Sequence, residues 1–466
     1  MGSGEQGTPT RHGSFRMGGW LVQPELNRVC HGGRTVGLEP RLMDVLVFLA
    51  DRAGQVVSKD QLIDGVWKTE FITEWAITRA IAKLRRALGD EADAPRYIET
   101  ISKRGYRLIA AIQGAPAEPV AGPAAAEPRG VPAGGVPFVV GQWVRGAQFY
   151  GRQAQLAEIL DGNRDCVWVL GTRVSGKTSL LRQLELVAET EPGRGLLPVF
   201  WDLQGAAEPS DLDSYFSEAL VESRSRLDAA GVDIGPLLGR ELFVALGGLR
   251  RAVCEQGRKL LLLCDEAEEL IGLGRRAPAL LRKLRRALQA REGVRTVLAA
   301  SARLWALAEQ SEDTSPFLHG FTPPVYLGSL TDGEARALVT QSQLDAPVRP
   351  CFDHDTIERM LDLCGGHPYL LSLLGSRLLA CGDLAAATAE VEADPTLQHL
   401  FAVDLSLLAA EEAAFLSAVA GQGGGPPALP ARGAYQVERL GLVRQVEGRH
   451  VVGNHFLDQW LRRSPS

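Results

Sequence analysis

The sequence predicts a multidomain α/β protein, and three observations support this fold class. The chain has 466 residues, about three times the length of a typical domain. Residues 113–137 contain six Pro, five Gly and seven Ala, a composition that cannot form a packed core. After this segment, short apolar runs alternate with helical segments, as in a three-layer α/β domain with a mainly parallel sheet. We expect a tail, a first domain, a linker and three further parts, with bounds 1–14, 15–112, 113–137, 138–330, 331–400 and 401–466.

Composition excludes several classes of protein. The chain is 45% hydrophobic and 23% charged, which is ordinary for a soluble globular protein. Its longest aliphatic runs fall far short of the roughly 18 residues that span a bilayer, so we expect no membrane segment and no export. The seven cysteines include no C-x-x-C pair, which argues against a disulfide framework or a structural zinc site. We therefore expect a cytoplasmic protein.

The first domain shows three helical segments and a final hairpin. We expect helices at 38–53, 58–67 and 73–89, and strands at 97–102 and 106–110. In the third helix Ile77, Ile81, Leu84 and Leu88 share one face, and basic residues lie on the other. Between positions 75 and 107 there are eight Lys and Arg against four Asp and Glu. A basic helix followed by a basic-tipped hairpin is the geometry of a winged helix, although a basic stripe alone is also compatible with a solvated charged face.

A family resemblance favours the winged helix. The run AITRAIAKLRRALGDEADAPRYIETISKRGYRL resembles the DNA-binding domain of OmpR/PhoB-type transcriptional regulators. The resemblance implies double-stranded DNA as a partner, and it implies that the loop Lys68 to Ile72 is where RNA polymerase would be contacted. It assigns these residues to the DNA-facing helix and then to the wing: Trp75, Thr78, Arg79, Lys83 and Arg86, then Lys103, Arg104 and Arg107. The sequence shows no phosphorylatable receiver domain, so the input signal must arrive by another route.

A phosphate-binding motif follows the linker. The apolar run 166–170 is expected to be a buried strand, and GTRVSGKT directly after it satisfies G-x-x-x-x-G-K-[ST]. Gly171 and Gly176 allow backbone N–H groups to curl around phosphates, Lys177 neutralises the β and γ phosphates, and the Thr178 hydroxyl binds Mg²⁺. Strand, loop and helix in this order indicate a P-loop that binds ATP and Mg²⁺, and the predicted nucleotide-binding segment also includes Ser175 and Ser179.

A second strand carries the acids that a P-loop needs. In KLLLLCDE, residues 259–266, four leucines predict a central parallel strand with Asp265 and Glu266 at its carboxyl end. Asp265 would hold Mg²⁺ through water, and Glu266 would polarise the attacking water. Further strands are expected at 197–203, 295–301 and 324–327, alternating with helices around 211–229, 241–256 and 277–291.

A second resemblance covers roughly residues 137–400. The segment PFVVGQWVRGAQFYGRQAQLAEIL, the P-loop, LLLLCDE, ASAR and CGGHPYLL together resemble the STAND class of AAA-related ATPases, which hold nucleotide between a P-loop domain and a helical lid. The resemblance implies that Tyr150, Gly151 and Arg152 lie near the nucleotide base and that Ser301 and Arg303 sense the γ phosphate. It also implies that Gly366 and Pro368 contact the nucleotide from the lid. A surface ion pair is the alternative for Arg303.

The last part is expected to hold a helix, a hairpin and a terminal helix. Runs 442–446 and 449–452 flank Glu447-Gly448, a strong hairpin turn. This order predicts a C-terminal winged-helix-like domain, and its mixed charges favour a packing and regulatory role over DNA contact.

These features predict an ATP-dependent STAND-type switch that controls a sequence-specific DNA-binding transcriptional regulator. The switch would be a slow ATPase that forms a homo-oligomer in one nucleotide state. The alternative is an antiphage or stress-defence ATPase that senses nucleic acid through its winged helix, and an ATPase motor on DNA ranks third.

Overall fold

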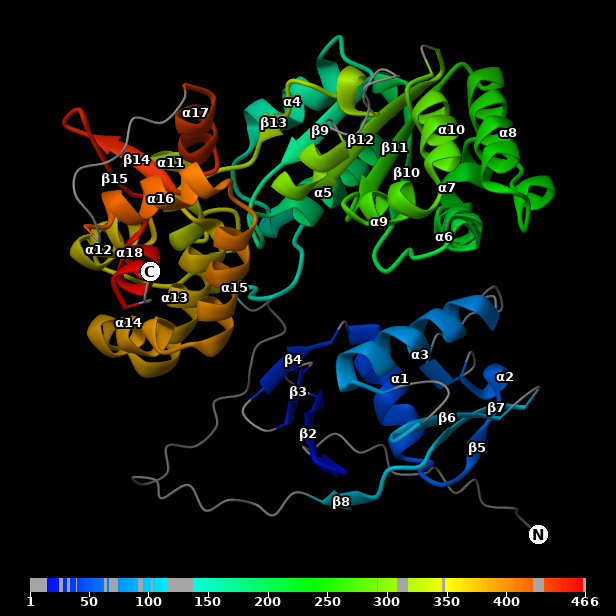
Figure 1. Cartoon of the computed structure of the whole chain (residues 1–466), viewed down its shortest axis with the longest axis horizontal. Helices are drawn as coiled ribbons and strands as arrows, with labels where there is room; N and C mark the ends of the chain where they lie inside the picture. The colour runs from blue at the N-terminus through cyan, green and yellow to red at the C-terminus, as the bar shows by residue number, and fades with distance from the viewer. Residues whose placement is uncertain are drawn as a thin grey trace. The chain divides into compact units, whose positions relative to one another are not determined.

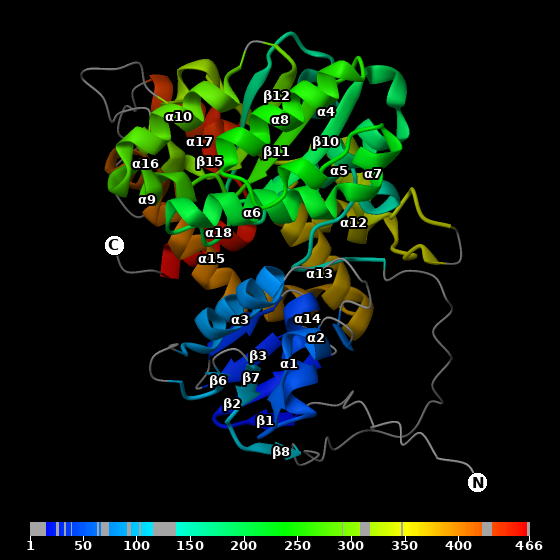
Figure 2. The same ribbon diagram turned by 90° about the vertical axis from the view of Figure 1, so that its right-hand side faces the viewer.

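The chain forms two compact units, residues 1–130 and 131–466, which are described separately. A computed structural model describes residues 15–24, 28–31, 34–38, 40–62, 65–66, 74–90, 95–101, 104–114, 137–290, 292–307, 317–345, 348–421 and 431–463. Figures 1 and 2 show the whole chain in two views. The expected tail 1–14, the loop Lys68 to Ile72, Lys103 and most of the linker 113–137 lie outside the described residues.

In its described residues, the first unit combines three α-helices with two antiparallel sheets. The larger sheet has the order β4-β3-β2-β1-β8, and the smaller one β5-β7-β6. The larger sheet consists of β1 (Phe15–Met17), β2 (Trp20–Gln23), β3 (Arg28–His31), β4 (Arg34–Gly37) and β8 (Ile112–Gly114). The smaller sheet and the helices are β5 (Val56–Val57), β6 (Ile98–Ile101), β7 (Gly105–Leu108), α1 (Pro40–Ala50), α2 (Lys59–Leu62) and α3 (Glu74–Leu88). The first and third expected helices and the final hairpin are confirmed, whereas of the second expected helix, 58–67, the α-helix α2 covers Lys59–Leu62 and residues 63, 64 and 67 lie outside the described part.

The L-G-D sequence after α3 sets the position of the hairpin. Gly89 has φ +64°, the left-handed conformation that commonly ends a helix. The buried Asp90 carboxylate then accepts backbone N–H groups of Arg96, Tyr97 and Ile98 at 2.6, 3.2 and 2.8 Å. From the helix side, the Arg85 guanidinium donates to the Ile98 carbonyl at 2.7 Å. Helix and hairpin are therefore fixed to each other by hydrogen bonds as well as by the buried apolar face of α3.

The second unit contains a five-stranded sheet in which all strands run parallel, with the order β10-β11-β12-β9-β13. Helices cover both of its faces (Figure 1). The strands are β9 (Cys166–Leu170), β10 (Leu196–Asp202), β11 (Lys259–Asp265), β12 (Val294–Ala300) and β13 (Val325–Tyr326). The helices are α4 (Gln153–Asp161), α5 (Lys177–Thr190), α6 (Pro209–Glu222), α7 (Arg224–Ala229), α8 (Leu242–Glu255), α9 (Glu269–Arg276) and α10 (Pro278–Leu288). The predicted P-loop three-layer α/β core is confirmed, except that the segment expected as one helix at 211–229 divides at Ser223.

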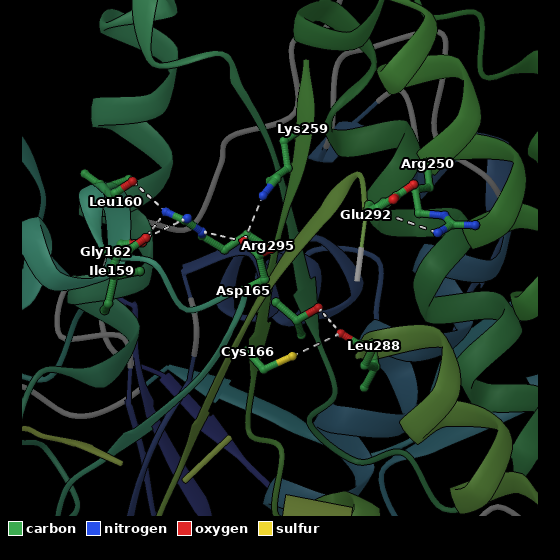
Figure 3. Close-up of polar contacts among 11 residues, drawn as sticks. Ile159, Leu160, Gly162, Asp165, Cys166, Arg250, Lys259, Leu288, Glu292 and Arg295 are labelled. Carbon is green, nitrogen blue, oxygen red and sulfur yellow. Dashed lines mark hydrogen bonds and ion pairs between the residues drawn. The ribbon is translucent and has the colours of Figure 1, made fainter. Parts of the chain in front are cut away.

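A polar network closes the N-terminal edge of this sheet (Figure 3). The buried Arg295 donates to the carbonyls of Ile159 and Leu160 at 2.9 and 2.6 Å and to that of Gly162 at 2.8 Å. These acceptors lie at the end of α4, where helix carbonyls lack intrahelical partners. Asp165 accepts from Arg295 and Lys259 at 3.4 and 2.9 Å. Three strand starts and one helix end are thereby joined.

A helical region and a short C-terminal segment complete the unit. They contain α11 (Asp332–Val339), α12 (His354–Cys364), α13 (Pro368–Cys381), α14 (Leu384–Glu392), α15 (Pro395–Ser406), α16 (Ala410–Val419), α17 (Ala431–Arg439), β14 (Val443–Val446), β15 (Arg449–Val452) and α18 (His455–Arg463). Glu447 and Gly448 both have positive φ, as a two-residue hairpin turn requires. Glu392 of α14 pairs with His455 and Arg463 of α18, both at 2.9 Å. Helix α15 spans the expected boundary between 400 and 401.

Among the described residues, no helix is long and apolar enough to cross a membrane.

Candidate functional site

The C-terminal edge of the parallel sheet gathers the predicted phosphate-site residues. The loop after β9 leads into α5, while β10 and β11 end in register at Asp202 and Asp265. Gly171 has no room for a side chain, because a Cβ there would lie 2.4 Å from the Ser175 hydroxyl oxygen. Gly176 has φ +95° directly before α5. These two glycines therefore shape a loop whose following helix N-terminus is suited to an anion.

Lys177 and Thr178 begin α5 and face the rest of this edge. The Lys177 ammonium donates to the carbonyls of Gly171 and Thr172 at 3.2 and 2.8 Å, so it lies over its own loop. The Thr178 hydroxyl donates to Asp265 at 2.7 Å. This hydrogen bond joins the two predicted motifs, which are 87 residues apart in the sequence.

Burial controls the acids at the end of β11. It raises the pKa of Asp265 to about 6, against the opposing effects of the Thr178 hydroxyl and the Lys177 charge. Burial also raises the pKa of Glu266 to about 7, and Glu268 and Asp265 add to the shift. Glu266 has φ +52°, a conformation that costs a non-glycine residue about 1 kcal/mol. Strained backbone of this kind is frequent at catalytic sites, which supports a role for this carboxylate.

Three oxygens at the same edge are buried and lack a hydrogen-bond partner among the described residues. They are Ser175 Oγ, Ser301 Oγ and Glu268 Oε2. Native proteins pair most buried polar atoms, so this group indicates a place that receives a polar ligand. Ser301 follows β12 directly, although the expected strand 295–301 included it, and Arg303 is exposed in the short 3-10 helix Ala302–Leu307.

The residues expected near the nucleotide base are Tyr150, Gly151 and Arg152. They lie where the core meets the helical region. Arg152 is buried with φ +64°, and its guanidinium donates to the carbonyls of Gly328 and Ser329. Its backbone N–H donates to Glu334 of α11 at 2.7 Å. Burial lowers the pKa of Arg152 to about 10, which leaves it charged at neutral pH. Arg152 thus links the core to α11.

The lid motif contacts the same junction. Gly366 has φ +75°, and its carbonyl accepts the Leu330 N–H at 2.8 Å. Pro368 is the first residue of α13, and Tyr150 is buried near the start of α4. Arg152 and Gly366 line a cavity of about 700 Å³, but no residue of the loop Gly171–Ser179 does. The structure therefore brings Arg152 and Gly366 together beside one cavity, whereas Tyr150, Gly151 and Pro368 do not line it. Of the loop residues, Ser179 is turned away, and its hydroxyl accepts the Val144 N–H at 3.1 Å.

An aspartate that sequence reasoning did not identify also contacts the loop. Asp404, on α15, accepts the backbone N–H of Arg173 at 3.1 Å. Burial raises the pKa of Asp404 to about 6, although the Arg173 N–H and the Lys177 and Arg173 charges oppose this. A carboxylate from the helical region therefore lies against a loop that is shaped to bind phosphate.

The donor set is compatible with Mg²⁺. Hydroxyl and carboxylate oxygens are the ligands that Mg²⁺ prefers, and it usually keeps several waters and takes substrate phosphates. Thr178 and Asp265 supply such oxygens 2.7 Å apart. Among the described residues there is no group of three or more His, Cys, Asp or Glu side chains that could hold a metal ion by themselves.

Comparisons with known proteins agree with both halves of this architecture. Residues 144–387 match the family model Novel STAND NTPase 1, which is more than half of the chain. The chain belongs to the Novel STAND NTPase 1 family. Residues 33–108 match the model "Transcriptional regulatory protein, C terminal", so the N-terminal winged helix of this STAND protein is of the OmpR/PhoB type.

Two transcriptional activators each match a short part of the chain. The transcriptional activator CadC of Escherichia coli is 48% identical over 95 residues, 20% of this chain and 19% of CadC. The cholera toxin transcriptional activator of Vibrio cholerae is 38% identical over 71 residues, 15% of this chain and 24% of that protein. Each match thus spans less than a quarter of the relative.

Among solved structures, a Walker-type ATPase of Pyrococcus abyssi resembles the STAND part. It has a TM-score of 0.51 at 16% identity, and the match covers 70% of this chain and 99% of that one. At this identity the likeness concerns the fold alone.

The predicted DNA-facing residues are only partly described. The backbone of α3 carries Trp75, Thr78, Arg79 and Arg86, whose side chains lie outside the described part, and Lys83 is half-buried. In the wing, Arg104 is exposed, whereas Arg107 forms an ion pair with Glu99 at 2.6 Å. A phosphate contact from Arg107 would therefore have to compete with Glu99. The roles of all predicted site residues stay predictions.

Sequence reasoning missed Asp202, Glu334 and Asp404. Asp202 ends an apolar strand in the same way as Asp265, so its position could have been noticed. The signal for Glu334 is weaker, a Thr331-Glu334 capping box at the start of α11. Asp404 lies inside an ordinary helix, and only the fold shows that it reaches the loop.

Proposed function

We propose that the chain is an ATP-dependent switch that controls a sequence-specific DNA-binding transcriptional regulator. The Thr178–Asp265 hydrogen bond carries the proposal, because it assembles the predicted phosphate loop and metal-binding acid at one sheet edge. The N-terminal unit belongs to the same class of domain as transcriptional activators, which supports a regulator rather than a defence ATPase.

The residues at the sheet edge have separate tasks in this proposal. Lys177 and the loop N–H groups bind the β and γ phosphates, and Thr178 and Asp265 hold Mg²⁺, which supplies charge neutralisation to the phosphates. Glu266 orients and polarises a water, for which a pKa near the operating pH suits a general base. Ser301 and Arg303 respond to the γ phosphate. The resulting hydrolysis is slow, and its rate sets the lifetime of the ATP-bound state.

The helical region couples the nucleotide to the rest of the chain. Asp404 of α15 contacts the loop, and Glu392 of α14 holds α18. A nucleotide that displaces α15 would therefore also shift the C-terminal segment, which we propose to be winged-helix-like and to regulate assembly. By linkage, any effect of nucleotide on DNA affinity implies an equal effect of DNA on nucleotide affinity.

The decisive experiment measures DNA binding by the full-length chain with an ATP analogue, with ADP and without nucleotide. We expect affinity for a multi-site promoter fragment to differ between these states, and we expect Arg303→Ala to remove the difference. Analytical ultracentrifugation on the same samples reports assembly. Invariant DNA affinity together with an unchanged monomer would contradict the switch, and binding that depends on DNA length but not on sequence would favour the defence alternative.

A further inference from the structure

Helices α9 and α10 carry a basic surface that the phosphate site does not use. Residues 270–291 contain seven Arg and Lys and no Asp or Glu. Five of these side chains are exposed, at the end of α9 and along α10, and together they are called the α9–α10 surface: Arg275, Arg276, Arg282, Lys283 and Arg286. This concentration of positive charge lies in a part of the chain, residues 113–466, where Asp and Glu outnumber Lys and Arg by 43 to 34.

The arrangement on α10 separates charge from core. At about 100° per residue, Arg282, Lys283 and Arg286 fall within roughly a quarter to a third of the helix circumference. Leu284 and Leu288 on the other side are buried. Helix α10 lies between β11 and β12 in the chain and packs next to α8 (Figure 2). The exposed stripe of cations is on this helix.

The α9–α10 surface is not neutralised within the described residues. None of its five side chains forms an ion pair there, and Lys283 only lies 5.6 Å above the ring of Phe243. Some cations elsewhere in this unit are paired: Arg182 and Arg226 share Glu185, and Arg336 contacts Glu358. Like charges on neighbouring turns repel one another weakly in water, and a bound polyanion would replace this repulsion with attraction.

A groove continues the surface toward α8. Its volume is about 380 Å³, and Phe243, Leu246 and Ala287 contribute to its apolar part. Its charged lining consists of three cations, Arg250, Lys283 and Arg286, and one acid, Glu241. Arg250 donates to the carbonyl of Glu292 at 3.2 Å and is thereby held at the rim (Figure 3). The cations are therefore distributed over two adjacent helices rather than along one edge.

We infer that the α9–α10 surface binds the sugar-phosphate backbone of duplex DNA, as a second contact beside the N-terminal winged helix. Helix α10 has 11 residues and is about 16 Å long, a length over which duplex DNA presents roughly nine phosphate charges. Four of the five cations are arginines, whose planar fork matches phosphate oxygens. The inference rests on the proposed function in one respect, since the winged helix would bring DNA to the chain and raise its local concentration.

The test uses the full-length chain with the triple substitution Arg282→Gln, Lys283→Gln and Arg286→Gln. Its control removes three exposed cations elsewhere in the unit, Arg240→Gln, Arg359→Gln and Arg449→Gln, and so changes net charge equally. We measure affinity for a 40-base-pair duplex of shuffled sequence over a salt series. The slope of log affinity against log salt is negative, and three lost phosphate contacts should make it less steep by about 2 to 3 units. Affinity at 0.1 M salt should fall by at least ~10-fold, while the control changes little.

Equal slopes for wild type and triple variant, or equal losses in triple variant and control, would overturn the inference. Unchanged ATP binding establishes that the triple variant is folded. A fluorescent polyglutamate peptide tests the other class of occupant: if it binds the wild type but not the triple variant, while DNA slopes stay equal, the surface takes an acidic protein. Arg79→Ala with Arg86→Ala reports separately on the winged helix, so a failure of the proposed function is distinguishable.

Discussion

The two edges of the central parallel sheet hold their polar groups in opposite ways. At the N-terminal edge, Arg295 donates to three carbonyls and to Asp165, and Lys259 completes the network. At the C-terminal edge, Ser175 and Ser301 hydroxyls are buried without a described partner, and two acids have raised pKa values. A network in which the polar groups have hydrogen-bond partners stabilises the fold. Buried polar groups without a partner are instead available to bind a ligand. Substitutions at the two edges should therefore affect different measurements.

The largest effect is expected from Lys177→Ala, with Lys259→Ala at the opposite edge as the matched control. Loss of the Lys177 ammonium should weaken ATP binding by at least ~10²-fold, because Lys177 is the cation that the motif places over the phosphate loop, at the start of α5. Lys259→Ala should leave ATP binding nearly unchanged and lower thermal stability instead. Titration calorimetry with an ATP analogue measures the first effect, and equal affinities in the two variants would contradict the division between the edges.

Arg295→Leu should give the largest loss of stability. The substitution leaves Asp165 with Lys259 as its remaining cation and removes the donor from three carbonyls around the end of α4. We expect the free energy of unfolding to fall by about 3 kcal/mol. Urea denaturation checks this, with the exposed Arg251→Leu as control, expected to change stability by less than about 0.5 kcal/mol. ATP affinity of the folded Arg295→Leu protein should match wild type; a selective loss of affinity would mean that this edge also controls binding.

The contrast between the edges also explains what the sequence could predict. The C-terminal edge could be predicted because phosphate binding needs Gly171, Gly176, Lys177 and Thr178 in a fixed order. The acids at this edge also stand directly after apolar runs that predict buried strands. All five strands of the sheet were predicted within one residue at each end, since continuous apolar runs indicate buried parallel strands. β13 is one residue shorter than expected at each end.

The N-terminal edge gives no such signal. Arg295 looks like any basic residue in a strand, and its acceptors are backbone carbonyls, which have no sequence identity. Likewise, the contacts of Arg152 with Gly328 and Ser329 depend on how the helical region folds back on the core. The predicted nearness of Arg152 and Gly366 came from the family resemblance, and the structure places both beside one cavity, away from the phosphate loop.

Glu266→Gln should separate chemistry from binding at the C-terminal edge. The amide retains the shape of the side chain but cannot accept a proton, so single-turnover hydrolysis should slow by at least ~10²-fold while ATP affinity is retained. Glu269→Gln is the control three residues along the chain, because Glu269 accepts the Gly205 N–H at 3.0 Å and is assigned no chemistry. Equal rates for wild type and Glu266→Gln would remove the catalytic role from Glu266.

The smallest effect concerns Asp404, the carboxylate that reaches the C-terminal edge from α15. It accepts the Arg173 N–H at 3.1 Å, and the Lys177 charge is close enough to lower its pKa. Backbone N–H groups of such a loop and the lysine are the donors that a phosphate would use. Asp404 therefore occupies part of the phosphate-binding capacity of the loop, as an internal anion.

Asp404→Asn should consequently raise affinity for ADP and for an ATP analogue, by about tenfold or ~1.4 kcal/mol at low ionic strength, with a smaller gain at high salt. The asparagine can still accept the Arg173 N–H, so the change isolates the negative charge. Asp355→Asn, at an exposed position on α12 that does not line the cavity beside Arg152 and Gly366, removes the same charge away from the loop and should leave affinity unchanged. Affinity that falls in Asp404→Asn, or that rises equally in both variants, would show that Asp404 does not compete with phosphate but supports the loop or acts only through overall charge.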